Sequence, residues 1–341
     1  MKLQHYFFSF ILIFSFLLFS GCSTKKVFEP ENITGDWEKT SQLDTKIVDK
    51  SSNIALLGNN KVLINDKIYN VKVKQGYRVL GYNKKYLITT DIKGDLDLYN
   101  TKTKQHSLFS LKKTVAAAST DEDVIAVVFA DGDLALYSLS NKELLLKLDG
   151  SASIALDSRI VNPYFMDDLV LFLTLDGKVV IVNKKLKKRL RTIIVSATEY
   201  FNNVIFFDIL QDKLIVATAT KILSFGSSEQ RADLEARNIT HDKKDLYVAT
   251  KQGDIIQLSP NLHVKAKVHF PFAHFLALSV KDNKLYALEK EGYLIVLSKD
   301  LLKYNIYEVE IDDESTIYQG KNKIYINNKA ILLSNDTNNS K

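Results

Sequence analysis

The hydrophobic pattern of the chain is clearest in residues 285–297, which read LYALEKEGYLIVL. Two apolar runs flank the pair Glu291-Gly292, and glycine permits the positive φ that a tight hairpin turn requires. Apolar side chains occupy both parities of each run, whereas a strand with one face in water would alternate apolar and polar residues. The pattern therefore predicts a β-hairpin that is covered on both faces.

The same hairpin pattern recurs along the chain. Its clear copies are YLITTDIKGDLDLYN (86–100), VIAVVFADGDLALYSL (124–139), LVLFLTLDGKVVIVN (169–183) and DLYVATKQGDIIQLS (245–259). Two copies lack the turn glycine, KLIVATATKILSF (213–225) and KIYINNKAILLS (323–334), and the weakest copy is NIALLGNNKVLIND (53–66). The turns fall at Asn60, Gly94, Gly132, Gly177, Lys221, Gly253, Gly292 and Asn328. A period of about 38 residues fits one four-stranded propeller blade.

These copies predict an all-β protein, a β-propeller of eight four-stranded blades. Seven blades, if the weakest copy is a false match, and an open solenoid are the alternatives. The last copy ends without an outer strand, whereas residues 36–40 (DWEKT) form a spare extended segment near the start of the body. We expect this segment to complete the last blade and close the ring. The predicted single propeller domain spans residues 35–334, and residues 335–341 form a polar tail.

The amino terminus has the pattern of a secretion signal. Lys2 precedes an apolar run that is too short for a comfortable membrane span, and the run ends in Phe19-Ser20-Gly21-Cys22. This ending resembles the bacterial lipobox. The resemblance implies a signal peptide over residues 1–21, cleavage between Gly21 and Cys22, and lipidation of Cys22. An uncleaved anchor and an ordinary secretory signal are the alternatives.

Residues 22–34 are polar and are expected to act as a tether. Ser23 after the lipidated cysteine implies sorting to the outer membrane, where the protein would be lipid-anchored on the periplasmic face. The periplasmic face of the inner membrane is the alternative.

Composition narrows the possible chemistry. The net charge of +6 is spread along 341 residues and does not indicate nucleic-acid binding. Cys22 is the only cysteine, which excludes an internal disulfide and a cysteine-based metal site. A cysteine-free body is compatible with an oxidising compartment.

The strand–turn–strand pattern of LVLFLTLDGKVVIVNKKLKKRLRTI is similar to the quinoprotein-type (PQQ-like) propeller repeat. Eight such repeats behind a lipobox resemble the BamB family, lipoproteins of the β-barrel assembly machinery. The family carries a tryptophan in its outer strands, whereas Trp37 is the only tryptophan here and lies in the proposed closing segment.

The BamB resemblance implies a non-enzymatic scaffold, a monomeric propeller within a complex, whose partners are envelope proteins such as the β-barrel assembly machinery. A propeller that binds another envelope protein, a glycan or a small ligand is the alternative. No cofactor is expected, because the quinone-dependent members of the propeller family use a disulfide between adjacent cysteines that this chain cannot form.

Few residues suggest a reaction or a metal. The turn aspartates Asp95, Asp131, Asp133, Asp176 and Asp254 repeat with the blade, which indicates local turn chemistry rather than catalysis. His263, His269 and His274 lie close together in sequence, but a metal site would need convergent ligands. Inter-blade packing or surface exposure is the preferred interpretation for these histidines.

The strongest local charge feature is KKLKKRLR at residues 184–191. It falls at the predicted outer strand of the fourth blade, where Lys and Arg commonly protect an exposed strand edge against pairing. The alternative is a patch for anionic lipid or an acidic partner, made by Lys187, Lys188, Arg189 and Arg191. Residues 199–204 (EYFNNV) fall in a long connection and are a candidate binding loop, and the aromatic-rich residues 270–275 (FPFAHF) are expected to fill a gap between blades.

Overall fold

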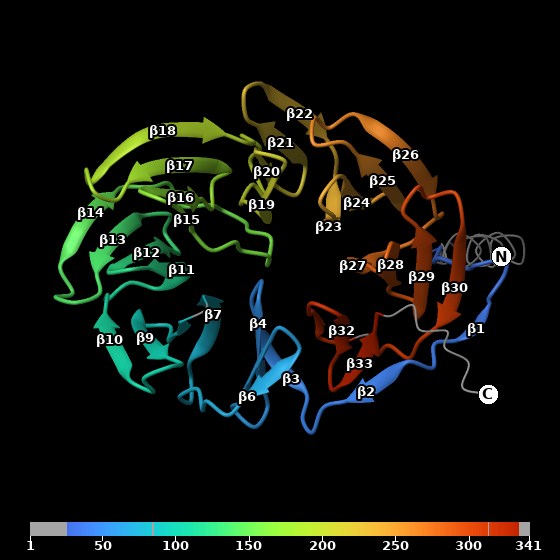
Figure 1. Cartoon of the computed structure of the whole chain (residues 1–341), viewed down its shortest axis with the longest axis horizontal. Helices are drawn as coiled ribbons and strands as arrows, with labels where there is room; N and C mark the ends of the chain where they lie inside the picture. Colours follow the sequence, from blue (N-terminus) through green and yellow to red (C-terminus); the bar gives the residue numbers. More distant parts are fainter. Residues whose placement is uncertain (1–25, 84, 313, 334–341) are drawn as a thin grey trace, which may run out of the picture.

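The structure is a computed structural model that describes residues 26–83, 85–312 and 314–333. Its described strands form eight sheets, antiparallel except for one added strand, which follow one another around a central axis (Figure 1). The first strand of each repeat lies nearest the axis, and the strands that follow it lie progressively nearer the outer rim. The predicted all-β propeller of eight blades is confirmed, and the weak first repeat is a true blade.

The blades follow the chain order. Blades 1 to 4 consist of β3 (Ile47–Lys50), β4 (Ile54–Leu57), β5 (Val62–Ile64) and β6 (Lys67–Tyr69); β7 (Arg78–Asn83), β8 (Tyr86–Thr90), β9 (Asp95–Asn100) and β10 (His106–Ser110); β11 (Val115–Asp121), β12 (Val124–Phe129), β13 (Leu134–Ser138) and β14 (Leu144–Leu148); β15 (Tyr164–Met166), β16 (Leu169–Leu173), β17 (Lys178–Asn183) and β18 (Lys188–Ile194).

Blades 5 to 8 continue in the same order. They consist of β19 (Phe206–Leu210), β20 (Lys213–Ala217), β21 (Lys221–Phe225) and β22 (Glu229–Asp233); β23 (Ala236–His241), β24 (Leu246–Thr250), β25 (Asp254–Leu258) and β26 (Val264–His269); β27 (Phe275–Lys281), β28 (Lys284–Glu289), β29 (Tyr293–Ser298) and β30 (Tyr304–Glu308); β31 (Ile317–Gln319), β32 (Lys323–Ile326) and β33 (Lys329–Leu332).

The amino-terminal segment closes the ring, as the missing outer strand of the last repeat predicts. Strand β2 (Thr40–Gln42) pairs antiparallel with β33 and supplies the fourth strand of blade 8. The closing strand begins at Thr40, a few residues later than expected. The residues before it, β1 (Gly35–Asp36), instead pair parallel with β30 and give blade 7 a fifth strand.

Trp37 lies between these two strands rather than in the closing strand. Its backbone N–H donates to the Glu308 carbonyl at 3.0 Å, and its ring makes edge contacts with Tyr286 and Tyr307 of blade 7. The indole therefore packs at the junction of blades 7 and 8, beside the closing strand.

Eight clusters of buried apolar side chains occupy the eight interfaces between neighbouring blades. The hairpin at 285–297 shows the arrangement, because Leu285 and Leu297 face a cluster shared with blade 6, whereas Leu288 and Leu294 face a cluster shared with blade 8. The double-sided apolar pattern thus arises because each blade lies between two others. Across the closing seam, Ile47 and Leu57 of blade 1 pack with Tyr318 and Tyr325 of blade 8.

A positive-φ residue forms the predicted hairpin turn in every blade except blade 5, where no residue between β20 and β21 has a positive φ. Gly94 adopts φ of +90°, and a Cβ there would lie 2.2 Å from the carbonyl oxygen of Lys113. Only glycine fits this close approach of the turn to the connection that follows the blade. In blade 8, which lacks the glycine, Asn327 takes the positive φ (53°), a conformation that asparagine tolerates.

Within the described part of the chain, no helix has both the length and the apolar character needed to cross a bilayer.

Candidate functional site

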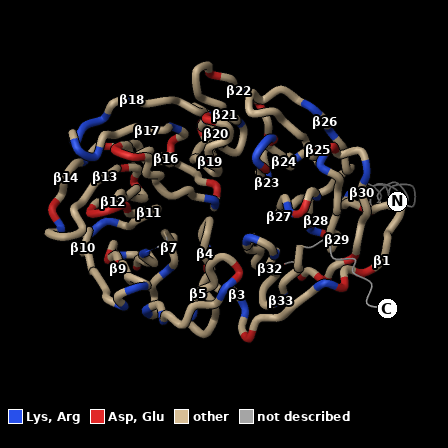
Figure 2. The backbone as a smooth tube through the Cα atoms, in the orientation of Figure 1, with Lys and Arg blue, Asp and Glu red and all other residues tan. Residues whose placement is uncertain are grey.

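The basic run at residues 184–191 leads into β18, the outer strand of blade 4, as the repeats predict. Figure 2 shows its blue stretch on the outside of the ring. Residues 188 to 192 of this strand are all exposed. The strand therefore presents a continuous row of side chains to solvent at the rim.

Two lysines of the run are neutralised locally. Lys184 is buried, and its ammonium donates to Asp121 at 2.6 Å and lies 3.3 Å from Glu122. Burial acts to lower the pKa of Lys184, but these two carboxylates together raise the pKa above its ordinary value. Lys185 forms an ion pair with Asp168 at 2.9 Å. Lys184 thus links blade 4 to a loop of blade 3, and Lys185 is paired within blade 4, so neither is a free charge for a binding surface.

The other four basic residues are those predicted as the patch. Arg191 places its guanidinium 4.7 Å from the ring centre of Phe225 in blade 5, a cation–π contact that fixes its position. Lys187, Lys188 and Arg189 are exposed and have no ion-pair partner among the described residues. The structure thus brings three free charges together at the start of the strand.

Apolar side chains accompany these charges. Leu186, Leu190 and Ile194 are 61%, 49% and 51% exposed, and all three lie on the same rim segment. We define the rim strip as residues 186–194, which combines unpaired cations with exposed aliphatic side chains on an edge strand. In the sequence these aliphatic residues are easily overlooked, because they are interspersed with the lysines and arginines of the basic run.

The axis of the ring holds a second candidate site, a cavity of about 460 Å³. All eight blades contribute inner-strand or connecting residues to its wall. Of the charged residues in the wall, Lys50, Arg78, Arg159 and Arg237 are cationic, and Asp49 alone is anionic. The carboxylate of Asp49 already accepts the backbone N–H of Val79 at 2.8 Å.

A connection between blades 3 and 4 crosses this cavity. Figure 1 shows this yellow-green segment, between β14 and β15, reaching the middle of the ring. At one end Arg159 donates to the carbonyl of Arg237 in blade 6, and at the other Asn162 donates to the carbonyl of Leu80 in blade 2 at 2.9 Å. We call residues 157–162 the plug.

The predicted binding loop at 199–204 has a different role for part of its length. Asn203 is fully buried, and its side-chain amide donates to the carbonyls of Asp157 and Arg159 at 3.2 and 2.9 Å while accepting the N–H of Asp157 at 2.8 Å. This amide anchors the plug. Tyr200 and Phe201 remain about half exposed at the loop tip.

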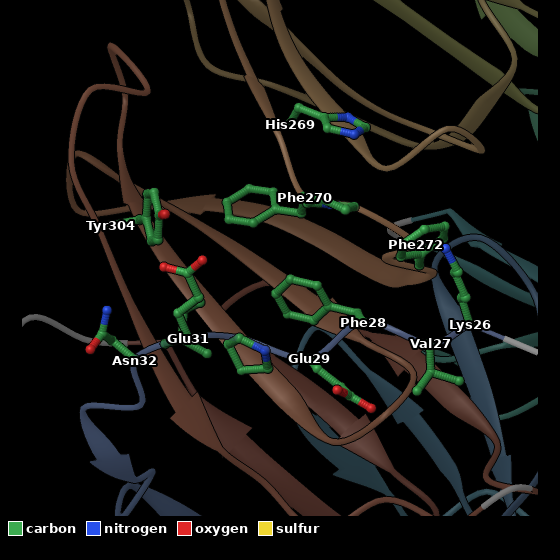
Figure 3. Close-up of a pocket in the computed structure, with 13 residues that line it drawn as sticks. Lys26, Val27, Phe28, Glu29, Glu31, Asn32, His269, Phe270, Phe272 and Tyr304 are labelled. Carbon is green, nitrogen blue, oxygen red and sulfur yellow. The ribbon is translucent and has the colours of Figure 1, made fainter.

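Residues 26–34, the second half of the predicted tether, lie along blade 7. Phe28 is 4% exposed, and its ring makes an edge contact with Phe270 at 5.9 Å (Figure 3). A second edge contact, with Tyr293, has a ring-centre distance of 5.7 Å. A cleft of about 620 Å³ lies between this segment and the start of blade 7, with Phe272 and Tyr304 in its wall. Phe270 and Phe275 are buried between blades 6 and 7, as expected for the aromatic-rich stretch.

The predicted histidines do not come together. His269 is bonded to Asp254 at 2.8 Å, whereas the backbone N–H of His263 donates to the Ser259 hydroxyl at 3.2 Å. Among the residues with described positions, no group of three or more His, Cys, Asp or Glu side chains is arranged to hold a metal ion.

The turn aspartates have mixed roles. Asp131 accepts the N–H of Asp133, which is local turn chemistry, but Asp133 also binds Lys113 at 2.6 Å and the N–H of Gly150 at 3.0 Å. The hydrogen bonds from Lys113 and Gly150 lower the pKa of Asp133 to about 2. Asp254 forms an ion pair with Lys267 on the adjacent outer strand.

The lipidation site Cys22 and the cleavage position Gly21 lie outside the described residues.

Comparison with known proteins supports the fold and provides sequence relatives. No protein-family profile matches the chain. It is 28% identical over 346 aligned positions to the plasminogen-binding protein PgbB of Helicobacter pylori strains J99 and 26695. The alignment covers 87% of this chain and 64% of each relative, so the chain spans less than two thirds of their length.

Solved structures with similar folds are much more distant in sequence. BamB from Moraxella catarrhalis superposes with a TM-score of 0.66 at 11% identity, over 85% of this chain and 97% of that one. AztD from Citrobacter koseri gives 0.55 at 14% identity, over 84% and 89% of the two chains. Sqt1 from Saccharomyces cerevisiae gives 0.60 at 10% identity, over 86% and 98%. These similarities show a shared propeller architecture.

Proposed function

We propose that this protein is a non-enzymatic scaffold, lipid-anchored through Cys22 on the periplasmic face of the outer membrane, that binds protein partners during outer-membrane protein assembly. The observation that carries the binding role is the rim strip, because it exposes unpaired cations, aliphatic side chains and a strand edge together. Sheet edges with alternating side chains are suited to recognise an extended partner segment.

The chain itself provides a precedent for adding a strand at the rim. Strand β1 pairs parallel with the outer edge of β30, with Gly35 opposite Tyr307 and Asp36 opposite Glu308. Among the described strands, β18 has no such fifth neighbour. A partner strand with acidic side chains would meet the edge through backbone hydrogen bonds and the cations of the rim strip through charge.

The comparisons support a scaffold role from two directions. BamB shares the architecture, and the sequence relatives are named for binding a protein. The name of the sequence relatives favours a binding role over an enzymatic one, and the BamB structure supports the architecture that would carry it.

Cross-linking in membranes tests the assembly role. We expect the lipidated wild-type protein to recover components of the β-barrel assembly machinery after cross-linking and solubilisation. The triple variant K187Q/K188Q/R189Q should recover much less of them, whereas K102Q/K104Q/K112Q, which removes the same charge from blade 2, should behave as wild type. Recovery of none of these components by the wild-type protein rejects the assembly role.

Anionic liposomes distinguish a protein partner from the membrane itself. If the rim strip binds lipid headgroups, a Cys22→Ala protein should bind these liposomes at low salt and release them at high salt, at about 1 kcal/mol per charge. We expect no difference between the rim variant and the blade 2 variant in this assay. A selective loss for the rim variant would assign the strip to lipid.

Membrane fractionation tests the anchor. Cys22→Ala should move the protein out of the membrane fraction and change its apparent mass, because several acyl chains make a stable anchor. A Cys22→Ala protein that stays in the membrane fraction at unchanged size would disprove lipidation.

A second candidate function is the binding of plasminogen, favoured by the sequence similarity to PgbB over 87% of this chain. Surface plasmon resonance with immobilised plasminogen tests it. Saturable binding would support this candidate, and its absence would leave an envelope partner as the occupant of the rim.

A further inference from the structure

The axial cavity has a charge arrangement that the scaffold role does not use. Arg78 enters from β7 in blade 2 and Arg237 from β23 in blade 6, and neither guanidinium has a hydrogen-bond or ion-pair partner among the described residues. An arginine fork carries five donors, and because Arg78 is exposed and Arg237 is half-buried, the donors of both are accessible to an anion that enters the cavity.

The cations around the cavity repel one another. Desolvation and the nearby charge of Arg159 both lower the pKa of Lys50. Desolvation and Arg159 likewise lower the pKa of Arg237, against the opposing effect of Asp157 and Glu235. Arg159 is itself paired with Asp157, its Nε lying 2.8 Å from that carboxylate. Positive charge is therefore in excess at the axis.

The shape of the cavity is fixed by a built framework. The plug spans the axis between blades 6 and 2, and the buried amide of Asn203 holds it from the connection between blades 4 and 5. Gln319 and Asn238 add side-chain bonds between neighbouring inner strands, to the carbonyls of Leu278 at 2.7 Å and Leu276 at 3.2 Å. A volume of about 460 Å³ suits a small molecule.

We propose that the axial cavity is a binding site for a small multivalent anion, a molecule with two or more carboxylate or phosphate groups, held by Arg78, Arg237 and Lys50. Arginine pairs bidentately with both kinds of group. The ligand would bridge blades that face each other across the ring and would neutralise the excess charge on the plug. This site is independent of the rim strip and of any protein partner.

Calorimetric titration of the purified full chain at low salt tests the proposal, with citrate and inorganic pyrophosphate as probes and triethyl citrate as an uncharged probe of the same skeleton. We expect saturable one-site binding of at least one anion and none of the ester. Citrate alone would indicate a carboxylate ligand, and pyrophosphate alone a phosphate ligand.

Variants of the two cavity arginines test whether the anion binds in the axial cavity. R78Q and R237Q should each raise the Kd by about tenfold or more, the loss expected for one charge-assisted pair. K187Q/K188Q on the rim should leave the Kd unchanged. The unliganded melting temperatures of R78Q and R237Q should equal or exceed that of wild type, because each removes a repulsive charge, and this measurement separates lost binding from lost folding. Absence of saturable binding for both anions, or equal affinity in R78Q, R237Q and wild type, overturns the proposal.

Discussion

Individual turn residues decide how closely the elements of this ring approach one another. Gly94 illustrates this, because its turn lies against the backbone at Lys113 with no room for a methyl group. Gly76 has a similar positive φ (+81°), but a Cβ there would have no neighbour within 4 Å. A side chain at Gly76 would meet backbone strain alone, whereas a side chain at Gly94 would meet both backbone strain and a steric clash.

Gly94→Ala should destabilise the protein more than Gly76→Ala. The second change costs about 1–2 kcal/mol for placing a side chain at positive φ, whereas the first adds a collision with the Lys113 carbonyl. Urea unfolding of both variants measures the difference. Equal losses of unfolding free energy would show that the turn moves to accommodate the methyl group.

A second residue-scale prediction concerns His241, whose Nε2 lies 2.7 Å from the Asp208 carboxylate of the neighbouring blade. The hydrogen bond to Asp208 raises the pKa of His241 above its ordinary 6.5, although burial opposes the shift. Because the pKa of His241 is higher in the folded state, its protonated ring stabilises the folded protein. This stabilisation is fully present below pH 6.5 and is lost as the pH rises through the folded-state pKa.

The unfolding free energy should therefore fall as the pH rises from about 6 to about 8. Asp208→Asn should flatten this slope, and Asp212→Asn, an exposed aspartate in the following turn, should preserve it. Chemical unfolding across this pH range is the measurement. A wild-type slope that persists in Asp208→Asn would show that His241 titrates without help from Asp208.

At the scale of elements, the decisive feature is the amino-terminal segment that completes blade 8. The repeats predict the missing outer strand, since the last copy of the pattern stops after its hairpin. They place the closing segment at residues 36–40, whereas pairing with β33 uses Thr40–Gln42. The reason is that the preceding residues are taken by the outer edge of blade 7, a parallel contact that no repeat copy announces.

A chain that begins at residue 45 should melt well below one that begins at residue 35. The shorter chain loses both β1 and β2, so blade 8 has three strands and the seam between the first and last blades is exposed. We expect a fall of roughly 10 °C, on a scale of about 2–4 °C per kcal/mol for domains of 150–250 residues. Calorimetry measures it, and equal melting temperatures would disprove closure by this segment.

The whole molecule behaves as one ring because every blade shares two apolar interfaces. Leu288 is fully buried toward blade 8, whereas Leu302 is 79% exposed on the surface of the same blade. The same leucine-to-alanine substitution at these two positions compares the stability contribution of a blade interface with that of the surface.

Leu288→Ala should lower the unfolding free energy by about 2–5 kcal/mol, the range for truncating a buried leucine. Leu302→Ala should change it by less than about 0.5 kcal/mol. Equilibrium unfolding monitored by two probes measures both values. A second transition in Leu288→Ala would indicate that blades 7 and 8 unfold separately from the rest of the ring.

The candidate sites were predictable to different degrees. The position of the basic run on the outer strand of blade 4 follows from the repeats, because a run after the turn of a known copy must fall there. The repeats do not predict that two lysines of the run are neutralised while three cations stay unpaired. The neutralising carboxylates come from elsewhere: Asp121 belongs to blade 3, and Asp168 belongs to a different turn of blade 4. For the same reason the sequence did not predict the cluster of cations at the axis, because its members come from four separate parts of the chain.

One sequence signal for the axis was present but ambiguous. The step from Gly132 to Gly177 is 45 residues, longer than the mean period. It accommodates the connection that contains the plug, and the following step of 44 residues contains Asn203, which anchors it. Extra length shows where a connection is long, but not whether it enters the axis or stays at the rim.

The sequence by itself determined the all-β class, the period of the repeat, the hairpin in each blade and the need for a closing strand. These properties are periodic, so each copy of the pattern reports them again. Only the tertiary structure decided which residues close the ring, which cations stay unpaired on the rim strip and which side chains meet around the axis. Those outcomes depend on contacts between residues far apart in the chain, and closure of the ring brings together inner strands that the repeat treats as equivalent.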